Sequence, residues 1–465
     1  MNYIKEKYQS FIDYYNKNKL LVNILMLTIF GICSFITQSM TIVLILVASA
    51  IILTSNENDG VMYILMLCPF TACLRMFDVE VTIVSLAGVW ALKYFVLKLK
   101  NKQIKFSNPI TISCLVLALY FILPFGPYNI YKLAYTGFYI LFMMLISIFW
   151  QDRNNFNLKQ LTYTFAIALI ISVIFAPIAD NIPNCHKFIP ECISSNFVRN
   201  CAMLGNPNVF SIICVLCTSM LATILLKEKT LKPAILLVLM LFIGFTSFSK
   251  TYVIVATILA MFTYLYLLIE YKGKYKKQLN IASIILTCLI FILGVSFIIK
   301  RTSGNGILDI STLTTGRTDI WVWCIAEMGK TPLTIAFGCG MGIWVFKGEF
   351  HSAHNLYVEI LYRLGIFGTC IVLAIIIFFV FTIIKQMKGK NVLKNLVPIM
   401  MFAIYAMSET FLTVYTIFLV PFCIAFLAYD KERCQNITQE ANISNFAADD
   451  LERLAMMNQS TDNQQ

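Results

Sequence analysis

Charged residues are scarce in this 465-residue sequence, where they make up only 13% of the chain, and histidine occurs three times. Hydrophobic residues make up 59%. A soluble core cannot hide so large an apolar fraction, so the composition excludes a soluble globular protein. It predicts an all-α polytopic membrane protein instead.

Several signatures of soluble enzymes are also missing. The sequence has no Gly-x-Gly-x-x-Gly after a strand, no phosphate-binding loop with its lysine and no His-Glu-x-x-His, so no motif indicates a nucleotide or zinc-protease site. The net charge of +12 does not indicate nucleic acid, because the Lys and Arg residues cluster between apolar runs. There they set membrane topology and contact anionic lipid.

Apolar runs long enough to cross a bilayer, which takes roughly 20 residues, occur about fourteen times. Basic clusters such as residues 98–105 orient these runs, because such clusters stay in the cytoplasm. The resulting map has five consecutive regions: a cytoplasmic N-terminus (1–19), transmembrane helices with an external loop at 179–207 (20–299), an external catalytic loop (300–363), C-terminal transmembrane helices (364–429) and a disordered cytoplasmic tail (430–465).

Most of the 15 cysteines lie in apolar segments, where cysteine behaves as a small hydrophobic residue. Cys185, Cys192 and Cys201 instead share the polar loop at 179–207. One disulfide is feasible among these three residues, but the sequence alone does not decide whether it forms.

Arg317 precedes a segment with helical spacing. Ile320 and Cys324 fall on one side of residues 318–328, which predicts an amphipathic helix at the membrane interface. At the N-terminal end of that helix, an anion would be attracted by the Arg317 guanidinium and by backbone N–H groups. The alternative is that Arg317 pairs with Asp319 or reaches lipid headgroups.

Two histidines, His351 and His354, precede a second predicted helix. A neutral imidazole can take a proton from a hydroxyl near external pH, which makes His354 a candidate general base. The two histidines would bind a metal only if Glu349 or Glu359 were recruited as well. The alternative for both is an ordinary loop histidine without a role.

Three glycines alternate in Gly338-Cys-Gly340-Met-Gly342, between the two predicted helices. Glycine lets the backbone turn tightly or approach a ligand closely. A plain turn is the favoured interpretation.

Lys250 and Arg199 are two further cations on the predicted outer side. Lys250 interrupts an apolar hairpin, and Arg199 precedes the segment 205–208; the alternative for both is simple interfacial anchoring. Together with Arg317 and His354, they fit an anion tethered to lipid, such as a polyprenyl pyrophosphate. A leaving pyrophosphate needs charge neutralisation, and an attacking sugar hydroxyl needs a base.

A set of short motifs occurs in a fixed order between residues 200 and 385: Gly205-Asn-Pro-Asn208, Ser249-Lys250, Gly316-Arg317 with Trp321 downstream, Gly338-x-Gly340-x-Gly342, and His354-Asn355 followed by Glu359, Leu361 and Gly365-Ile-Phe-Gly368. In this combination the chain resembles the superfamily of O-antigen ligases and O-antigen or capsule polymerases, which are bacterial membrane glycosyltransferases. Residues 1–180 resemble it only as serial membrane helices.

The resemblance implies a helical membrane fold of the lipid-sugar glycosyltransferase C type. It implies a metal-independent, inverting transfer of a glycan from undecaprenyl pyrophosphate to an acceptor hydroxyl, on the outer face of the bacterial cytoplasmic membrane and without a cofactor. The implied site residues are His354 as general base, Arg317, Lys250 and Arg199 for the pyrophosphate, and Asn355, Gly340 and Glu359 in support.

Lys250 departs from the superfamily, which usually has Arg after the Ser at this point. A lysine offers a point charge in place of a bidentate fork, so the phosphate geometry would differ. The implied partners are the lipid-linked oligosaccharide and membrane lipid, with a chain-length regulator and a flippase as further candidates, and no nucleic acid.

Within this superfamily the preferred hypothesis is an envelope polysaccharide polymerase that adds lipid-linked glycan to a growing chain. The alternative is an O-antigen-type ligase that moves finished polymer to a lipid, wall or protein acceptor. A transporter or flippase for lipid-linked sugars is the alternative from another class. It is disfavoured because transporters place charges within the helix bundle and show internal symmetry.

Overall fold

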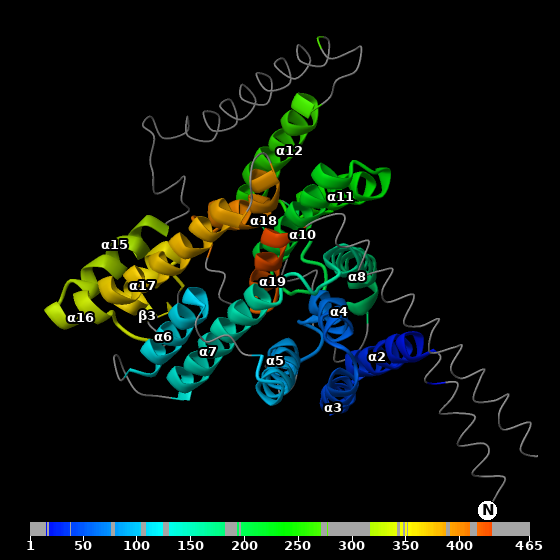
Figure 1. The fold of residues 1–465 in the computed structure, drawn as a ribbon, viewed down its shortest axis with the longest axis horizontal. Helices are drawn as coiled ribbons and strands as arrows, with labels where there is room; N and C mark the ends of the chain where they lie inside the picture. Colours follow the sequence, from blue (N-terminus) through cyan, green and yellow to red (C-terminus); the bar gives the residue numbers. More distant parts are fainter. Residues whose placement is uncertain are drawn as a thin grey trace, which may run out of the picture.

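A computed structural model of the protein describes the following residues: 15, 18–37, 39–75, 80–103, 108–123, 130–181, 193–194, 197–270, 277, 317–341, 345–346, 349–350, 352–386, 391–409 and 416–429. Almost all of their regular structure is helical (Figure 1). The predicted span at 281–299 and the predicted tail at 430–465 lie outside the described residues.

The helices follow one another along the chain in this order: α2 (Lys19–Ile36), α3 (Ser39–Thr54), α4 (Glu57–Leu67), α5 (Thr82–Lys100), α6 (Pro109–Ile122), α7 (Ile130–Gln151), α8 (Leu158–Ala179), α10 (Pro207–Glu228), α11 (Leu231–Phe245), α12 (Lys250–Glu270), α15 (Arg317–Met328), α16 (Pro332–Phe337), α17 (Leu356–Gln386), α18 (Asn391–Tyr405) and α19 (Leu419–Ala425). Short 3₁₀ turns follow α4 and α19, at Cys68–Phe70 and Phe426–Ala428.

Two minimal antiparallel ladders complete the regular structure. Strands β1 (Ile193–Ser194) and β2 (Phe197–Val198) pair in the first predicted loop. Strands β3 (Val345–Phe346) and β4 (Glu349–Phe350) pair in the second. Neither ladder changes the helical class of the fold.

Seven described helices, α2, α5, α7, α8, α10, α12 and α17, are long and apolar enough to cross a membrane. The helices α3, α6, α11 and α18 are apolar but shorter. The predicted class of polytopic membrane protein agrees with this result, whereas the predicted count of about fourteen spans is not confirmed. Some of the predicted runs form short helices, such as α4 with 11 residues and α19 with 7 residues.

Helix α2 shows how the surface is suited to lipid. One stripe of large apolar side chains is exposed along it, at Leu21, Leu25, Ile29, Ile32 and Ile36. The opposite face, which includes Leu27, is buried against the rest of the protein. An exposed apolar stripe of this length is unfavourable in water but is covered by hydrocarbon in a bilayer.

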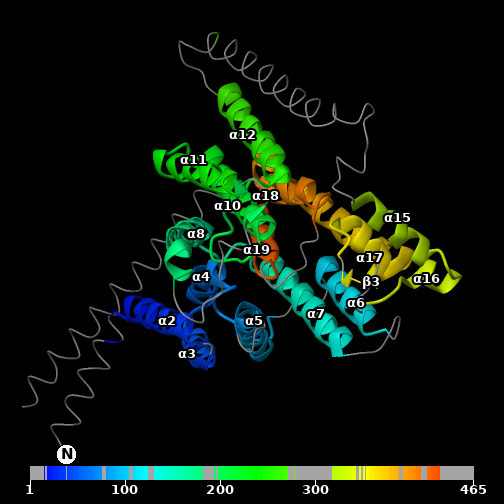
Figure 2. The same cartoon turned by 180° about the vertical axis from the view of Figure 1, so that it is seen from behind.

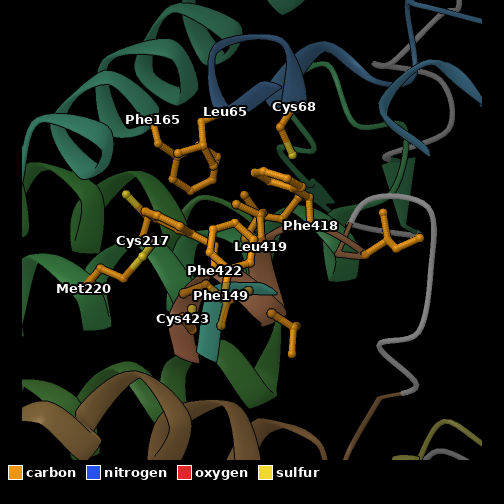
Figure 3. Packing of buried hydrophobic residues seen from close by; sticks show 14 of the residues in the cluster. Leu65, Cys68, Phe149, Phe165, Cys217, Met220, Phe418, Leu419, Phe422 and Cys423 are labelled. Carbon is orange, nitrogen blue, oxygen red and sulfur yellow. The ribbon is translucent and has the colours of Figure 1, made fainter. Parts of the chain in front are cut away.

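The core lies around α10, which is buried along nearly its whole length. Figure 3 shows Cys217 and Met220 of α10 close to a cluster of aromatic rings. In that cluster the Phe149 ring lies 5.4 Å from the Phe418 ring and 5.7 Å from the Phe422 ring, centroid to centroid. Figures 1 and 2 place α10, α18 and α19 in the middle, with α2 and α3 at one edge and α15 and α16 at the other.

Lysines and carboxylates pair at the C-terminal ends of α5, α7, α10 and α12 and at the N-terminal ends of α8 and α18. We call this the basic end of the bundle, and its ion pairs are Lys98–Asp152 (2.8 Å), Lys159–Glu228 (2.6 Å), Lys229–Glu270 (2.9 Å) and Lys394–Glu270 (2.9 Å). These lysines belong to the clusters that the sequence analysis placed on one side of the membrane. The structure pairs these four lysines with carboxylates at helix ends, and the membrane side that they face stays a prediction.

The opposite end of α10, α12 and α18 is here called the site end. It includes the start of α10, which is capped by a side chain. Asn206 caps α10, because its side-chain oxygen accepts from the N–H groups of Asn208 (2.8 Å) and Val209 (3.4 Å). Pro207 occupies the first helical position, where its missing N–H costs nothing. The motif at 205–208 is therefore a helix start that points Asn208 toward the site.

Helices α15, α16 and α17 pack together beside this end (Figure 2). Helix α15 confirms the helix predicted over 318–328. Helix α17 is broken at Gly365, whose φ of 62° and ψ of −167° are not helical. A short first part therefore leads into the long apolar part, close to the predicted start of a span at residue 364.

Candidate functional site

His354 lies immediately before α17 in an unusual backbone conformation. Its φ of 47° is in the left-handed region, which few residues other than glycine adopt. Asn355 caps the helix, since its side-chain oxygen accepts from the N–H groups of Tyr357 (3.0 Å) and Val358 (3.2 Å). The Leu356 N–H donates to the Ala406 carbonyl (2.9 Å), which ties the segment to the end of α18.

The imidazole of His354 is paired with a carboxylate. Its Nδ1 lies 2.8 Å from Oε1 of Glu409, just beyond α18, while 33% of the His354 side chain stays exposed. Because a carboxylate can only accept, Nδ1 carries a proton, and in the neutral imidazole Nε2 then presents a lone pair. This is the arrangement of an imidazole held ready to accept a proton at Nε2.

Arg317 binds the other oxygen of the same carboxylate. Its Nη2 lies 3.2 Å from Oε2 of Glu409, and its Nη1 donates to the Ser408 carbonyl. Of the two alternatives given above, the pair with Asp319 is replaced by the pair with Glu409. The guanidinium has five N–H groups, so donors remain for an anion beyond these two contacts.

Arg199 approaches the site from the segment before α10. Its Nε donates to the Ser247 carbonyl (2.9 Å), and its Nη2 donates to Oδ1 of Asn208 (3.0 Å). Burial lowers the pKa of the Arg199 guanidinium, and this shift is opposed in part by interactions with Tyr405 and Glu409. The Asn208 carbonyl accepts from the Tyr405 hydroxyl (3.3 Å), which links the residue that binds Arg199 to the end of α18.

Lys250 begins α12, directly after a hydroxyl cluster. Ser249 follows Phe248, whose backbone is also left-handed with a φ of 48°. The Ser249 hydroxyl lies 3.5 Å from the Tyr405 hydroxyl, which also bonds Ser211. These contacts join α10, α12 and α18 at the site end and fix where Lys250 enters its helix.

The alternating glycines form a support for α17. The N–H groups of Cys339 and Gly340 donate to the carbonyls of Tyr362 (2.7 Å) and Arg363 (3.1 Å), next to the break in the helix. A Cβ at Gly338 would lie 2.3 Å from the Arg363 carbonyl oxygen. The Gly340 N–H is thus used inside the protein, and the predicted turn serves helix packing; Gly342 lies outside the described residues.

Glu359 is buried one turn into α17. Its Oε2 accepts from the Ala353 N–H (3.1 Å), and its Oε1 accepts from Nε of Arg363 (2.7 Å). The carboxylate is therefore engaged by two donors of the protein. His351, which a metal role would also need, lies outside the described residues.

Among the described residues, two other chemistries would need a cluster of metal ligands or a reactive thiol. No group of three His, Cys, Asp or Glu side chains in that part of the chain is placed to hold a metal ion. Cys324, packed against Ala353, is the thiol beneath the site. Burial raises its pKa to about 12, so it stays a neutral thiol and a poor nucleophile.

Cys201 is disulfide-bonded, and the other described cysteines are free thiols. Its partner therefore lies outside the described residues, where Cys185 and Cys192 also lie. Disulfides persist in oxidising compartments. The bond agrees with the predicted outer position of this loop.

Glu409 is the site residue that the sequence analysis missed. Its signal was a single carboxylate between two apolar runs, where charge is costly unless it has a function. Tyr405 was missed as well, because an aromatic residue in an apolar run looks like core. The structure brings His354 and Arg317 together on Glu409 and links Arg199 to Tyr405 through Asn208, while the roles assigned to these residues remain predictions.

The chain matches no family model. It is similar to a ComP-specific O-oligosaccharyltransferase of Acinetobacter baylyi (strain ATCC 33305 / BD413 / ADP1), with 25% identity over 299 residues. That match covers 61% of this chain and 53% of the relative, so the chain spans about half the length of that protein.

The likeness supports the broad O-antigen ligase-like superfamily. It is too distant to give a closer relationship. It adds weight to the resemblance found in the motifs, and the apolar helices agree with a membrane protein of this kind.

Proposed function

We propose that this chain is a membrane oligosaccharyltransferase of the ligase type, which moves a lipid-linked glycan onto an acceptor hydroxyl. The observation that carries the proposal is the single carboxylate of Glu409, shared by the His354 imidazole at 2.8 Å and the Arg317 guanidinium at 3.2 Å. The base lies 55 residues and the cation 92 residues before this carboxylate in the sequence, and together they form a site for a nucleophile beside an anionic leaving group.

In the proposed reaction, the acceptor hydroxyl gives its proton to Nε2 of His354 while its oxygen attacks the anomeric carbon of the glycan. The new C–O bond forms as the bond to the pyrophosphate oxygen breaks. Glu409 stabilises the imidazolium that results, through its contact with Nδ1. Attack opposite the leaving group inverts the anomeric centre.

The leaving group in this proposal is undecaprenyl pyrophosphate, whose charge grows as the bond breaks. Arg317, Arg199 and Lys250 supply positive charge for it at the site end. The apolar surface of the helices offers the polyprenyl chain a lipid environment. The cations are proposed to face the outer side of the membrane, as the basic clusters at the other end require.

Ligase-type transfer is favoured because the relative is named as an O-oligosaccharyltransferase. The second candidate is the polysaccharide polymerase, which the shared motifs of the superfamily favour equally. Both would use the same base and cations. They differ in the acceptor, which is a growing glycan for a polymerase and a different molecule for a ligase.

The experiment is a transfer assay with the purified chain in proteoliposomes containing a labelled, undecaprenyl pyrophosphate-linked oligosaccharide. We expect undecaprenyl pyrophosphate to be released and the labelled glycan to appear on an added protein or lipid acceptor. Glycans that lengthen on the lipid carrier would select the polymerase instead. Absence of undecaprenyl pyrophosphate release with every acceptor would contradict both.

A further inference from the structure

A buried ion pair lies below the candidate base. Arg363 Nε and Glu359 Oε1 are 2.7 Å apart, and their side chains are 8% and 4% exposed. Replacing a buried pair of this kind by apolar side chains is often neutral or stabilising, because removing two charges from water is costly. Stability alone does not account for the placement of two charges here.

The carboxylate of Glu359 also binds the backbone directly before His354. Its Oε2 accepts from the N–H of Ala353, which is fully buried. The carbonyl of Ala353 accepts from Nε1 of Trp321 at 2.7 Å. We call these two bonds the Ala353 peptide contacts; they use side chains from α17 and α15.

Arg363 in turn holds Glu359 in place. Its guanidinium lies over the ring of Tyr135 on α7, 5.4 Å from the centroid, and its carbonyl accepts from the Gly340 N–H. Glu359 is therefore fixed between α7, the glycine turn and the first part of α17. A carboxylate held on several sides can direct a backbone group with little freedom.

The backbone of His354 is left-handed, so its conformation depends on contacts with neighbouring residues. A φ of 47° is strained for a residue other than glycine, and such a backbone persists only where its surroundings impose it. On the other side, the Leu356 N–H is bonded to Ala406. The backbone of His354 is thus held from both sides.

We propose that Glu359 is a positioning residue that acts with Trp321, through the Ala353 peptide contacts, to set the direction of the His354 imidazole toward Glu409. Arg363 keeps Glu359 in the orientation that this requires. The inference rests on the proposed function, in which His354 is the base. It assigns neither Glu359 nor Arg363 to the glycan or the pyrophosphate.

The test compares two double variants that both remove the buried charges. In Glu359→Gln/Arg363→Gln, the carboxamide at position 359 keeps an acceptor for the Ala353 N–H and can donate to the carboxamide at position 363. In Glu359→Met/Arg363→Met, the volume is similar but the acceptor is lost. Monodisperse elution and the melting midpoint of each protein are measured before kinetics.

We expect the glutamine pair to retain most of the native kcat. The methionine pair should lose about 100-fold in kcat, the effect of a misplaced catalytic group. Its KM for the lipid-linked donor should stay native, because Arg317, Arg199 and Lys250 are untouched. Equal kcat values for the two folded variants would overturn the proposal.

A second variant covers the case in which the methionine pair does not fold. Trp321→Phe removes the donor to the Ala353 carbonyl and leaves both charges in place. We expect a lower kcat with a native donor KM, and a native kcat would contradict the proposal. His354→Ala in the same assay separates the two hypotheses: if it stays active the proposed function fails, whereas an inactive His354→Ala beside a native Trp321→Phe removes only the positioning role.

Discussion

The two ends of the helix bundle use charge differently. At the basic end, lysines pair with carboxylates on neighbouring helices, and Glu270 binds both Lys229 and Lys394. At the site end, the carboxylate of Glu409 binds the Arg317 guanidinium through one oxygen and the His354 imidazole through the other.

The comparison separates structural charges from those suited to a reaction. Lys394 is 7% exposed and its position is explained by its partner on α12. His354 is one-third exposed, has a strained backbone and shares its partner with Arg317. Lys229 at the basic end also has a left-handed backbone and a shared partner, so these features do not separate the two ends. The difference is that the carboxylate at the site end holds an imidazole, which can take a proton, beside a guanidinium, which can bind an anion.

Exchanging the key carboxylate of each end should give opposite results. We expect Glu409→Gln to lower the rate of glycan transfer by about 10²- to 10⁴-fold, because the imidazole loses the charge that orients and stabilises it. The melting midpoint should change little. Glu270→Gln is the matched control: it should lower the melting midpoint while each folded molecule keeps its activity.

The space around two glycines, Gly365 and Gly31, gives a second contrast. In Gly365→Ala, the new Cβ would lie 2.4 Å from the Gly338 nitrogen at a φ of 62°, so we expect a loss of about 1 to 3 kcal/mol and reduced activity. In Gly31→Ala on α2, nothing lies within 4 Å of the new Cβ. Thermal unfolding in detergent compares the two, and equal midpoints would refute the backbone contact at the break in α17.

Arg317→Lys tests whether the site end needs a guanidinium or only a positive charge. A lysine keeps the charge but cannot bind Glu409 and the Ser408 carbonyl as a fork, so we expect roughly tenfold weaker transfer. Arg317→Ala should be worse, with a higher donor KM. If the lysine variant matches the native protein at all donor concentrations, the fork has no role.

The smallest effect is expected at the basic end. The Lys229 side chain is 52% exposed, so Lys229→Ala should change stability by less than about 1 kcal/mol. Lys394→Ala leaves a buried contact of Glu270 unmade and should destabilise more. A reversed order in urea or thermal unfolding would show that burial does not rank these two ion pairs.

Much of the helical fold could be predicted because the signals are local. Apolar runs and basic clusters located most helices, and helical spacing located α15. The number of spans was harder to predict. In the apolar run 61–74, for example, helix α4 already ends at Leu67, and a 3₁₀ turn with Pro69 follows. Length along the sequence does not show where a helix bends or stops inside a bundle.

The site could be predicted only in part, because its geometry depends on contacts distant in sequence. His354 and Arg317 carried recognisable chemistry on their own. Glu409 gained its meaning only when the end of α18 met the start of α17, through the bond of Leu356 to Ala406. The alternating glycines indicated a turn. That this turn packs against the Arg363 carbonyl could not be predicted without knowing that α17 breaks at Gly365.

The most direct measurement of the central claim is the single-turnover rate of glycan transfer by His354→Ala in proteoliposomes loaded with the lipid-linked donor. The account predicts at least a 10²-fold loss, with native folding and native donor binding, because only the base is removed. Transfer by His354→Ala at the native rate would contradict it.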